Sequence, residues 1–177
     1  MDSILLTTPR LHLRSATPEL AAADLNHRFE FSRLLEADIP QDWPPPLNDH
    51  NSKAFTLSYL QENPDAAGWA AWYFVLPGNA NEKSQAIGIG GFKGKPSPKG
   101  IVEVGYSVMP NYQRLGFASE ATAALIGWAI SQPNVQLVTA ETLPTLAASI
   151  RVLEKNGFEF LGEGSEEGVI RYGRRRD

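Results

Sequence analysis

Two hydrophobic periods alternate along the chain and predict its secondary structure. Near the start, Leu11 and Leu13 alternate with polar residues, a period of two that indicates a strand. Residues 17–19, Thr-Pro-Glu, then supply a cap, a first-turn proline and an acidic first turn, so we expect a helix that runs to about Ala37. Pro40 is expected to stop this helix, because proline has no backbone N–H to donate.

A proline-rich segment separates this helix from the next one. Residues 40–46 include three adjacent prolines, which fix φ and remove donors, so a stiff loop is expected. A second helix is predicted over about residues 49–62 and should end before Asn63-Pro64, because a residue that precedes proline avoids the helical conformation. Trp43 in the stiff loop can either line a substrate entrance or pack on the surface.

The rest of the chain predicts a sheet and then alternating helices and strands. Runs rich in β-forming residues, separated by turn formers, indicate an antiparallel meander at 69–76, 86–93 and 101–108. The later segments predict a helix at 118–131, a strand at 136–142, a helix at 144–156, and short strands at 158–163 and 169–172. This order favours an α+β domain over a doubly wound sheet. The glycines between 88 and 94 precede no helix, so we interpret them as close strand packing rather than a dinucleotide loop.

The composition supports one globular domain and argues against several classes of protein. The 177 residues are 42% hydrophobic and 10% aromatic, enough for a single core. A formal net charge of −4 disfavours nucleic acid as the main partner. The absence of cysteine removes disulfides and thiol nucleophiles, and His12, His27 and His50 lack zinc-ligand spacing. No apolar run approaches ~18 residues and no signal-peptide pattern opens the chain, so we expect a soluble, cytoplasmic protein without membrane contact.

A strand, a short loop and a helix follow one another in the segment that carries the most chemistry. The loop at 113–119 is expected to present unpaired N–H groups together with the positive end of the helix dipole, which favours phosphate. Gly116 and Ala118 are small enough for a diphosphate to approach the backbone. The loop lacks the Gly-Lys-Ser/Thr ending of a P-loop, so Mg²⁺-dependent nucleotide hydrolysis is not indicated. Taken alone, a tight strand-to-helix connection explains the same pattern.

Three stretches of the sequence match motifs of a known family. Residues 113–118 read Gln-Arg-Leu-Gly-Phe-Ala, and residues 148–158 form a helix-like segment that ends in Asn-Gly-Phe. The first resembles motif A, Gln/Arg-x-x-Gly-x-Gly/Ala, of the Gcn5-related N-acetyltransferase (GNAT) superfamily. The second is similar to that superfamily's other cofactor-side helix. Residues 8–14, Thr-Pro-Arg-Leu-His-Leu-Arg, resemble the start of its ribosomal-protein N-terminal acetyltransferase branch.

The resemblance implies a fold, a cosubstrate and a set of binding positions. It implies one α+β acetyltransferase domain over 1–177, whose mixed, mostly antiparallel sheet has a splayed parallel strand pair and flanking helices. Residues 1–65 would form acceptor-side helices, 69–172 the sheet and acetyl-CoA-binding core, and 173–177 a basic tail. Acetyl-CoA is the implied cosubstrate, and no metal is implied. The matching backbone and loop positions are Val108, Met109, Gln113, Arg114, Leu115, Gly116, Phe117, Ala118 and Ser119.

Glu103 is the candidate general base, since the acceptor amine must lose a proton to attack. It precedes Val108 on the motif A strand. A carboxylate half-buried by Val102, Val104 and Tyr106 can have a raised pKa, which suits a base. The alternative is a strand glutamate that faces solvent or pairs with a lysine or arginine.

Ser149 is the candidate proton donor to the departing CoA thiolate. It lies near the start of the second motif helix, and the alternative is an ordinary helix serine that bonds back to the preceding turn. Many relatives have Asn where this chain has Leu146, and many others have Tyr where it has Leu153. With neither Asn nor Tyr present, Ser149 or water would donate the proton to the thiolate, or the protein would be weakly active.

The sequence thus predicts an acetyl-CoA-dependent N-acetyltransferase that acts on a primary amine by direct transfer, since no cysteine can carry the acetyl group. A protein N-terminus is one acceptor, and the alternatives are a small or drug-like amine, or a non-catalytic acyl-CoA-binding module. Residues 19–65 hold an excess of acidic over basic side chains, which favours a cationic acceptor. The protein would be a monomer or a homodimer. The arginines at 174–176 are expected to form a frayed, solvated tail, with RNA contact as the less favoured alternative.

Overall fold

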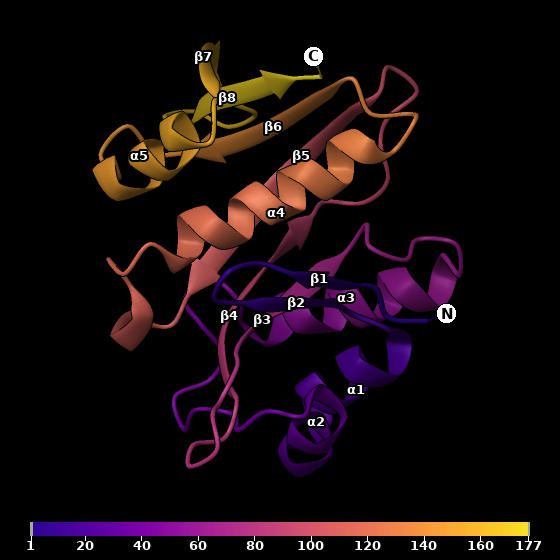
Figure 1. The fold of residues 1–177 in the computed structure, drawn as a ribbon. Coiled ribbons are helices and arrows are strands. Elements are labelled where there is room, and N and C mark those ends of the chain that lie inside the picture. Colours follow the sequence, from indigo (N-terminus) through magenta and orange to yellow (C-terminus); the bar gives the residue numbers. More distant parts are fainter. Residues whose placement is uncertain (1, 177) are drawn as a thin grey trace.

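An eight-stranded mixed sheet in the order β1-β2-β3-β4-β5-β6-β8-β7 organises the computed structural model, which describes residues 2–176 (Figure 1). Within that range the sheet strands are β1 (Leu5–Thr7), β2 (His12–Ser15), β3 (Ala71–Leu76), β4 (Gln85–Phe92), β5 (Ile101–Val108), β6 (Leu137–Thr142), β7 (Glu159–Glu163) and β8 (Ile170–Arg175). The helices are α1 (Pro18–Asn26), α2 (Arg28–Leu35), α3 (His50–Glu62), α4 (Phe117–Ser131) and α5 (Ala147–Lys155). The predicted α+β class with a mixed sheet is confirmed.

The antiparallel meander is longer than the sequence predicted. Strands β3, β4 and β5 pair antiparallel as expected, and β1 and β2 extend the same ladder at the N-terminal edge. The segment 1–65 therefore contributes strands to the sheet as well as helices. The close strand packing predicted for the glycines is also confirmed, because a Cβ atom at Gly88 or Gly90 would lie 2.7 or 2.5 Å from the ring of Phe74.

The single helix predicted to run to Ala37 is two helices, α1 and α2. The break is at His27, whose φ and ψ of −142° and 76° are not helical. His27 still donates its N–H to Ala23 O, and the chain then starts again in a new direction with Phe31 and Leu35 buried. Neither proline nor glycine marks this position, so the sequence has no signal for the break.

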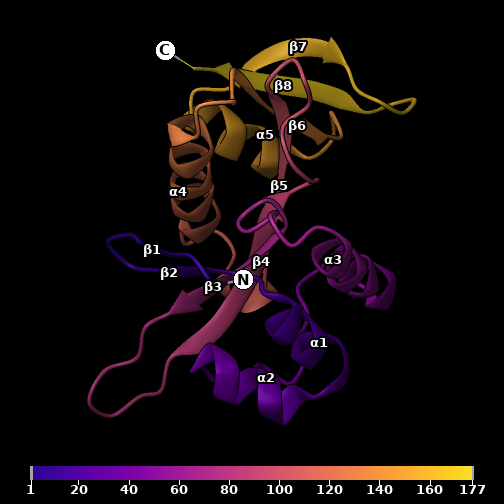
Figure 2. The ribbon, with the colours of Figure 1, turned by 90° about the vertical axis from the view of Figure 1, so that its right-hand side faces the viewer.

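Helices cover the two faces of the sheet unequally (Figure 2). On one face, α4 packs over residues such as Trp72 and Phe74, and α5 packs beside α4 over β6. On the other face, α1, α2 and α3 pack over Tyr73 and Val75, and this cover lies on the N-terminal half of the sheet. Successive residues of β3 serve opposite cores because side chains alternate along a strand.

The parallel pair is short and splays. Strands β5 and β6 pair in parallel only from Ile101 opposite Leu137 to Glu103 opposite Thr139. Beyond that point β5 continues along β4, while β6 continues along β8. A gap therefore opens between β5 and β6 at their carboxyl ends.

The predicted basic tail belongs to the fold as far as residue 176. Strand β8 reaches Arg175, so residues from 173 onward continue the sheet and do not fray. Arg174 donates to Asn156 O at 3.0 Å, and Arg176 donates to Gln132 O at 3.0 Å. The side chains of Arg174 and Arg176 are thus fixed by hydrogen bonds to backbone carbonyls. The prediction of a frayed, solvated tail is wrong for this reason. In residues 2–176 none of the helices combines the length and apolarity that crossing a membrane requires.

Candidate active site

The unpaired edge of β5 faces the gap. Met109 donates its N–H to Ile87 O at 2.8 Å, on the β4 side. Backbone groups of successive strand residues point to opposite sides, so those of Val104, Tyr106 and Val108 point toward β6. Since β6 has already diverged there, the Val108 N–H faces the gap, whereas the Met109 N–H is used within the sheet.

The loop between β5 and α4 adopts the shape expected of an anion-binding turn. A short 3₁₀ turn at Pro110–Tyr112 follows β5, and Gln113 then folds back to donate Nε2 to Val108 O at 3.0 Å. Arg114 and Gly116 have positive φ values of 62° and 84°, and Gly116 caps α4. The first N–H group that donates within the helix is that of Glu120, so the N–H groups of the preceding turn are free to meet a ligand.

Glu103 lies at the base of the gap, on the face opposite α4. Val102 and Val104 point into the core beneath α4, so the Glu103 side chain points the other way. Glu103 is half-buried as predicted, but Val102, Val104 and Tyr106 do not bury it, because strand neighbours alternate between faces. Glu103 instead forms an ion pair with Lys93, and its side chain is 22% exposed.

Gly105 leaves an open space beside Glu103 on the same face. A Cβ atom at Gly105 would meet no atom within 4 Å, and Gly105 is exposed although it lies on a central strand. Alternation along β5 places it on the Glu103 face. The backbone of β5 is therefore open to the surface directly next to the carboxylate.

Ser149 lies on the other side of β5, in the first turn of α5. Tyr106 donates its hydroxyl to Ser149 O at 3.3 Å, and the two hydroxyl oxygens are 3.5 Å apart. Burial raises the pKa of the Tyr106 hydroxyl above 10, although the hydrogen bond with Ser149 acts in the opposite direction. Tyr106 is therefore protonated at neutral pH. The sequence treated it only as a neighbour of Glu103, and its contact with Ser149, 43 residues away, depends on the tertiary fold.

The two leucines that replace the residues common in relatives differ in environment. Leu146 is the cap of α5 and is 48% exposed, so this helix begins later than the predicted start at 144. Leu153 is buried in the core that α4 and α5 share. Leu153 therefore serves packing.

Trp43 packs inside the N-terminal half of the molecule. Its ring centroid is 5.9 Å from that of Phe31, and its Nε1 donates to Asp24 Oδ1 at 2.8 Å. Asp24 also pairs with Lys53 Nζ at 3.0 Å and accepts from the Tyr73 hydroxyl at 3.4 Å. Burial and the nearby Asp24 charge raise the pKa of Tyr73 well above 10. Asp24 joins α1, the stiff loop, α3 and β3, and nothing in its alanine-rich sequence context signals this role.

Asp24→Ala is expected to destabilise the fold by about 3–5 kcal/mol, because it leaves the largely buried Lys53 ammonium without its partner. Urea unfolding followed by circular dichroism measures the change. The matched control is Asp38→Ala, whose partner Lys83 is 80% exposed, and about 1 kcal/mol or less is expected there. Equal losses in the two variants would contradict the structural role of Asp24.

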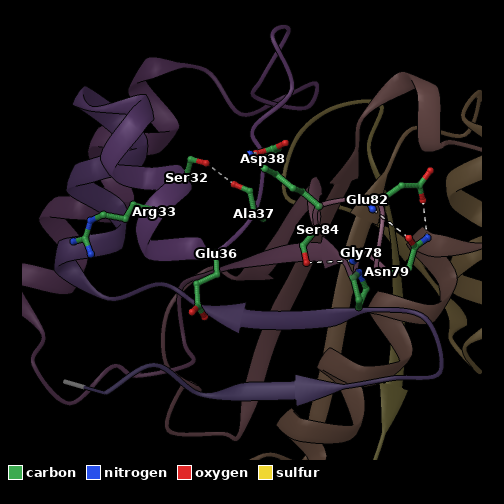
Figure 3. Close-up of a pocket in the computed structure, with 11 residues that line it drawn as sticks. Ser32, Arg33, Glu36, Ala37, Asp38, Gly78, Asn79, Glu82 and Ser84 are labelled. Carbon is green, nitrogen blue, oxygen red and sulfur yellow. Dashed lines mark hydrogen bonds and ion pairs between the residues drawn. The ribbon is translucent and has the colours of Figure 1, made fainter.

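A separate hollow lies away from this gap. It measures about 470 Å³ and lies between the end of α2 and the β3–β4 loop (Figure 3). Some of its polar groups bond to one another: the Ser32 hydroxyl donates to Ala37 O, and the Asn79 amide donates to Glu82. None of the site residues predicted from the sequence lines it. The candidate site is thus defined by the chemistry of the β5–β6 gap.

Comparison with known proteins identifies the family of this chain. Residues 10–159 match the family described as "Acetyltransferase (GNAT) domain". The chain is 29% identical over 160 residues to the uncharacterized N-acetyltransferase YjdG of Bacillus subtilis, covering 88% of this chain and 89% of that protein.

Solved structures share the same fold. Ribosomal-protein-S5-alanine acetyltransferase from Vibrio fischeri superposes with a TM-score of 0.65 at 21% identity, over 98% of this chain and 97% of that one. RimL, described as a ribosomal L7/L12 α-N-protein acetyltransferase in complex with coenzyme A, gives a TM-score of 0.65 at 18% identity over 98% and 99% of the two chains. The family match and the relative YjdG define an acyltransferase of the N-acetyltransferase class. The chain belongs to the GNAT acetyltransferase family.

Proposed function

We propose that this protein transfers an acetyl group from acetyl-CoA directly to a primary amine. The observation that carries the proposal is the gap between β5 and β6, which joins the loop before α4 at one end. Glu103 and Ser149 stand on opposite faces of the same strand beside this gap. A thioester placed in the gap would have a base on one side and a hydroxyl on the other.

The residues of the gap and loop suit the parts of acetyl-CoA. The pyrophosphate carries negative charge, which matches the positive dipole and the free N–H groups where α4 begins. The loop that would hold it consists of Gln113, Arg114, Leu115, Gly116, Phe117, Ala118 and Ser119. The pantetheine arm can lie along the unpaired edge of β5, where backbone groups of Val104 and Tyr106 also face the gap, which leaves the Val108 N–H for the thioester. Met109 supports this arrangement from within the sheet, through its bond to Ile87. When bound, acetyl-CoA supplies the activated acetyl group.

Glu103 and Ser149, on opposite faces of β5, would carry out the two proton transfers of the reaction. Glu103 accepts a proton from the acceptor ammonium, directly or through water, so that the amine can attack as the neutral species. The Val108 N–H donates toward the carbonyl oxygen, where negative charge grows during attack. When the C–S bond breaks, Ser149 donates a proton to the departing sulfur and regains, through water, the proton that the new amide nitrogen loses. The Tyr106 hydroxyl holds the first turn of α5 in place.

Ser149→Ala is expected to slow turnover by about tenfold, or 1.4 kcal/mol, with little change in acetyl-CoA binding. The loss is modest because a thiol with a pKa of about 8.5 leaves readily even without a proton donor. Steady-state kinetics with a saturating acceptor measures kcat, and Ser131→Ala at the exposed end of α4 is the matched control. Full kcat in the Ser149 variant would assign this serine to packing alone.

A protein N-terminus is the acceptor that we favour, and a small amine is the second candidate. The exposed backbone at Gly105, beside Glu103, is a position that the start of a peptide chain could approach. Two structural neighbours are named as acetyltransferases of ribosomal proteins, which supports the same class of acceptor. The acidic excess of residues 19–65 is partly neutralised, for example by Lys53 on Asp24 and Lys95 on Asp65, so charge selects the acceptor less strongly than the composition indicated.

The test is release of free CoA from acetyl-CoA in the presence of separate panels of N-terminal peptides and small amines. Peptide-dependent release with acetylated peptide detected by mass spectrometry supports the favoured acceptor. Release with small amines alone favours the second candidate. Calorimetric binding of acetyl-CoA without release in either panel would contradict catalysis and identify an acyl-CoA-binding module.

A further inference from the structure

The turn between β1 and β2 is fastened to the first turn of α4. Arg10 in this turn donates Nε to Glu120 Oε2 at 2.6 Å and Nη1 to Leu115 O at 2.9 Å. Its guanidinium carbon lies 4.5 Å from the centre of the Phe117 ring, a cation–π contact. Arg10, in the N-terminal hairpin, thus contacts Leu115 in the proposed pyrophosphate loop and both Phe117 and Glu120 in the helix that follows.

Glu120 is the anchor on the helix. The Thr8 hydroxyl donates to Glu120 Oε1 at 2.6 Å, and the Arg10 N–H donates to the same oxygen at 2.8 Å. The Glu120 side chain is only 15% exposed. Burial acts to raise the pKa of Glu120, but the hydrogen bonds from Thr8 and Arg10 and the Arg10 charge outweigh it, so its pKa is lowered and the carboxylate is charged at neutral pH.

The negative charge of Glu120 must be neutralised if the neighbouring loop is to bind a pyrophosphate. A carboxylate in the first turn of α4 lies close to the N–H groups that would receive the pyrophosphate, and like charges repel. Arg10 neutralises the carboxylate in a fixed geometry, since Nε and Nη1 are both occupied. Its Nη2 lies beside Gly116, where a Cβ atom would be 3.1 Å away.

The same contacts hold the loop in its unusual backbone conformation. Arg114 and Gly116 both have positive φ, and Leu115 between them is 55% exposed. The Leu115 carbonyl is held by Arg10, which fixes the peptide plane between the two left-handed residues. Such a conformation persists only where surrounding contacts determine it.

We propose that Arg10 is a positioning residue for the phosphates of CoA: it neutralises Glu120 and holds the Leu115 carbonyl, so that the loop before α4 is preset to receive the pyrophosphate. This inference rests on the proposed function. The N-terminal hairpin thereby becomes part of the cosubstrate site, although it lies more than 100 residues before the loop in sequence.

The test compares CoA with pantetheine, which lacks every phosphate. Arg10→Ala is expected to weaken CoA binding by about tenfold or more and pantetheine binding by less than about twofold, because only the phosphates meet the loop. Titration calorimetry measures the Kd for CoA, and the ligand-dependent shift of the unfolding midpoint measures that for pantetheine. Arg14→Ala is the matched control, because Arg14 on β2 also pairs with a glutamate, Glu36, and caps a carbonyl, that of Leu34. It should leave both affinities unchanged.

Two further variants test the mechanism. Arg10→Lys keeps the charge but cannot make both bonds, so an intermediate CoA affinity is expected. Adding Glu120→Gln to Arg10→Ala removes the uncompensated charge. The double variant should therefore bind CoA at least about threefold more tightly than Arg10→Ala alone, so the two effects are not additive. The inference is overturned if Arg10→Ala binds CoA as the parent does, or if it loses CoA and pantetheine affinity equally. If the parent itself binds no CoA, the proposed function fails first and this inference fails with it.

Discussion

Glu103→Gln is expected to lower kcat by about 100-fold or more while the Kd for acetyl-CoA stays nearly unchanged. The glutamine has the same size and lies at the same end of the parallel strand pair, but its amide cannot accept a proton from the acceptor. An acceptor amine with a pKa of about 8–10 is mostly protonated at neutral pH, so the reaction depends on proton removal. The cosubstrate site along Val108 and the loop is untouched by this change.

The ion pair between Glu103 and Lys93 offers the competing explanation for this residue. A partly exposed pair contributes about 0–1 kcal/mol to stability, so a purely structural Glu103 would leave catalysis nearly unchanged when replaced. Measuring kcat in steady-state assays over pH 6 to 9 distinguishes a general base from a residue that only forms an ion pair. A base predicts a large loss at low pH that shrinks as the acceptor becomes neutral without help.

The matched control is Glu159→Gln, which removes a carboxylate from the exposed outer strand β7. Its kcat should equal that of the parent at every pH. Lys93→Met removes only the partner of Glu103 and should keep at least partial activity, because the carboxylate remains. An unchanged kcat for Glu103→Gln across this pH range would exclude the role as base.

Gly116→Trp is expected to abolish measurable acetyl-CoA binding. Gly116 has a φ of 84° at the cap of α4, a conformation that residues with side chains adopt at a cost of about 1–2 kcal/mol. A side chain would also start 3.1 Å from Arg10 Nη2 and would extend over the N–H groups that face the phosphates. Both effects act on the loop, so binding is lost even where the rest of the fold is kept.

Calorimetry with acetyl-CoA measures this loss, and circular dichroism confirms that the helices remain. Gly127→Trp is the matched control: Gly127 is exposed on the same helix, and a Cβ there meets no atom within 4 Å. It should bind acetyl-CoA as the parent does. Gly116→Ala adds only a methyl group, and an intermediate Kd is expected. If Gly116→Trp bound acetyl-CoA with the parent's affinity, the pyrophosphate would have to lie elsewhere.

Periodicity and turn residues predicted most of the secondary structure correctly. The meander, the helix after Gly116 and the helix that ends near Gly157 are encoded locally, through alternation, caps and glycine. The break at His27 and the strand β1 were missed. The break has no glycine or proline, and β1 is a short, largely exposed edge strand whose pairing with β2 defines it.

The sequence by itself determined the family, the strand–loop–helix segment with its small residues, and the positions from which Glu103 and Ser149 were proposed, because all of these depend on residue types at short spacings. Only the tertiary structure decided their partners: Lys93 for Glu103, Tyr106 for Ser149, and Arg10 for Glu120. The last two pairs join residues 43 and 110 positions apart. Such contacts depend on strand order and on which face each side chain takes, and a long-range arrangement of this kind leaves no periodic signal in the sequence.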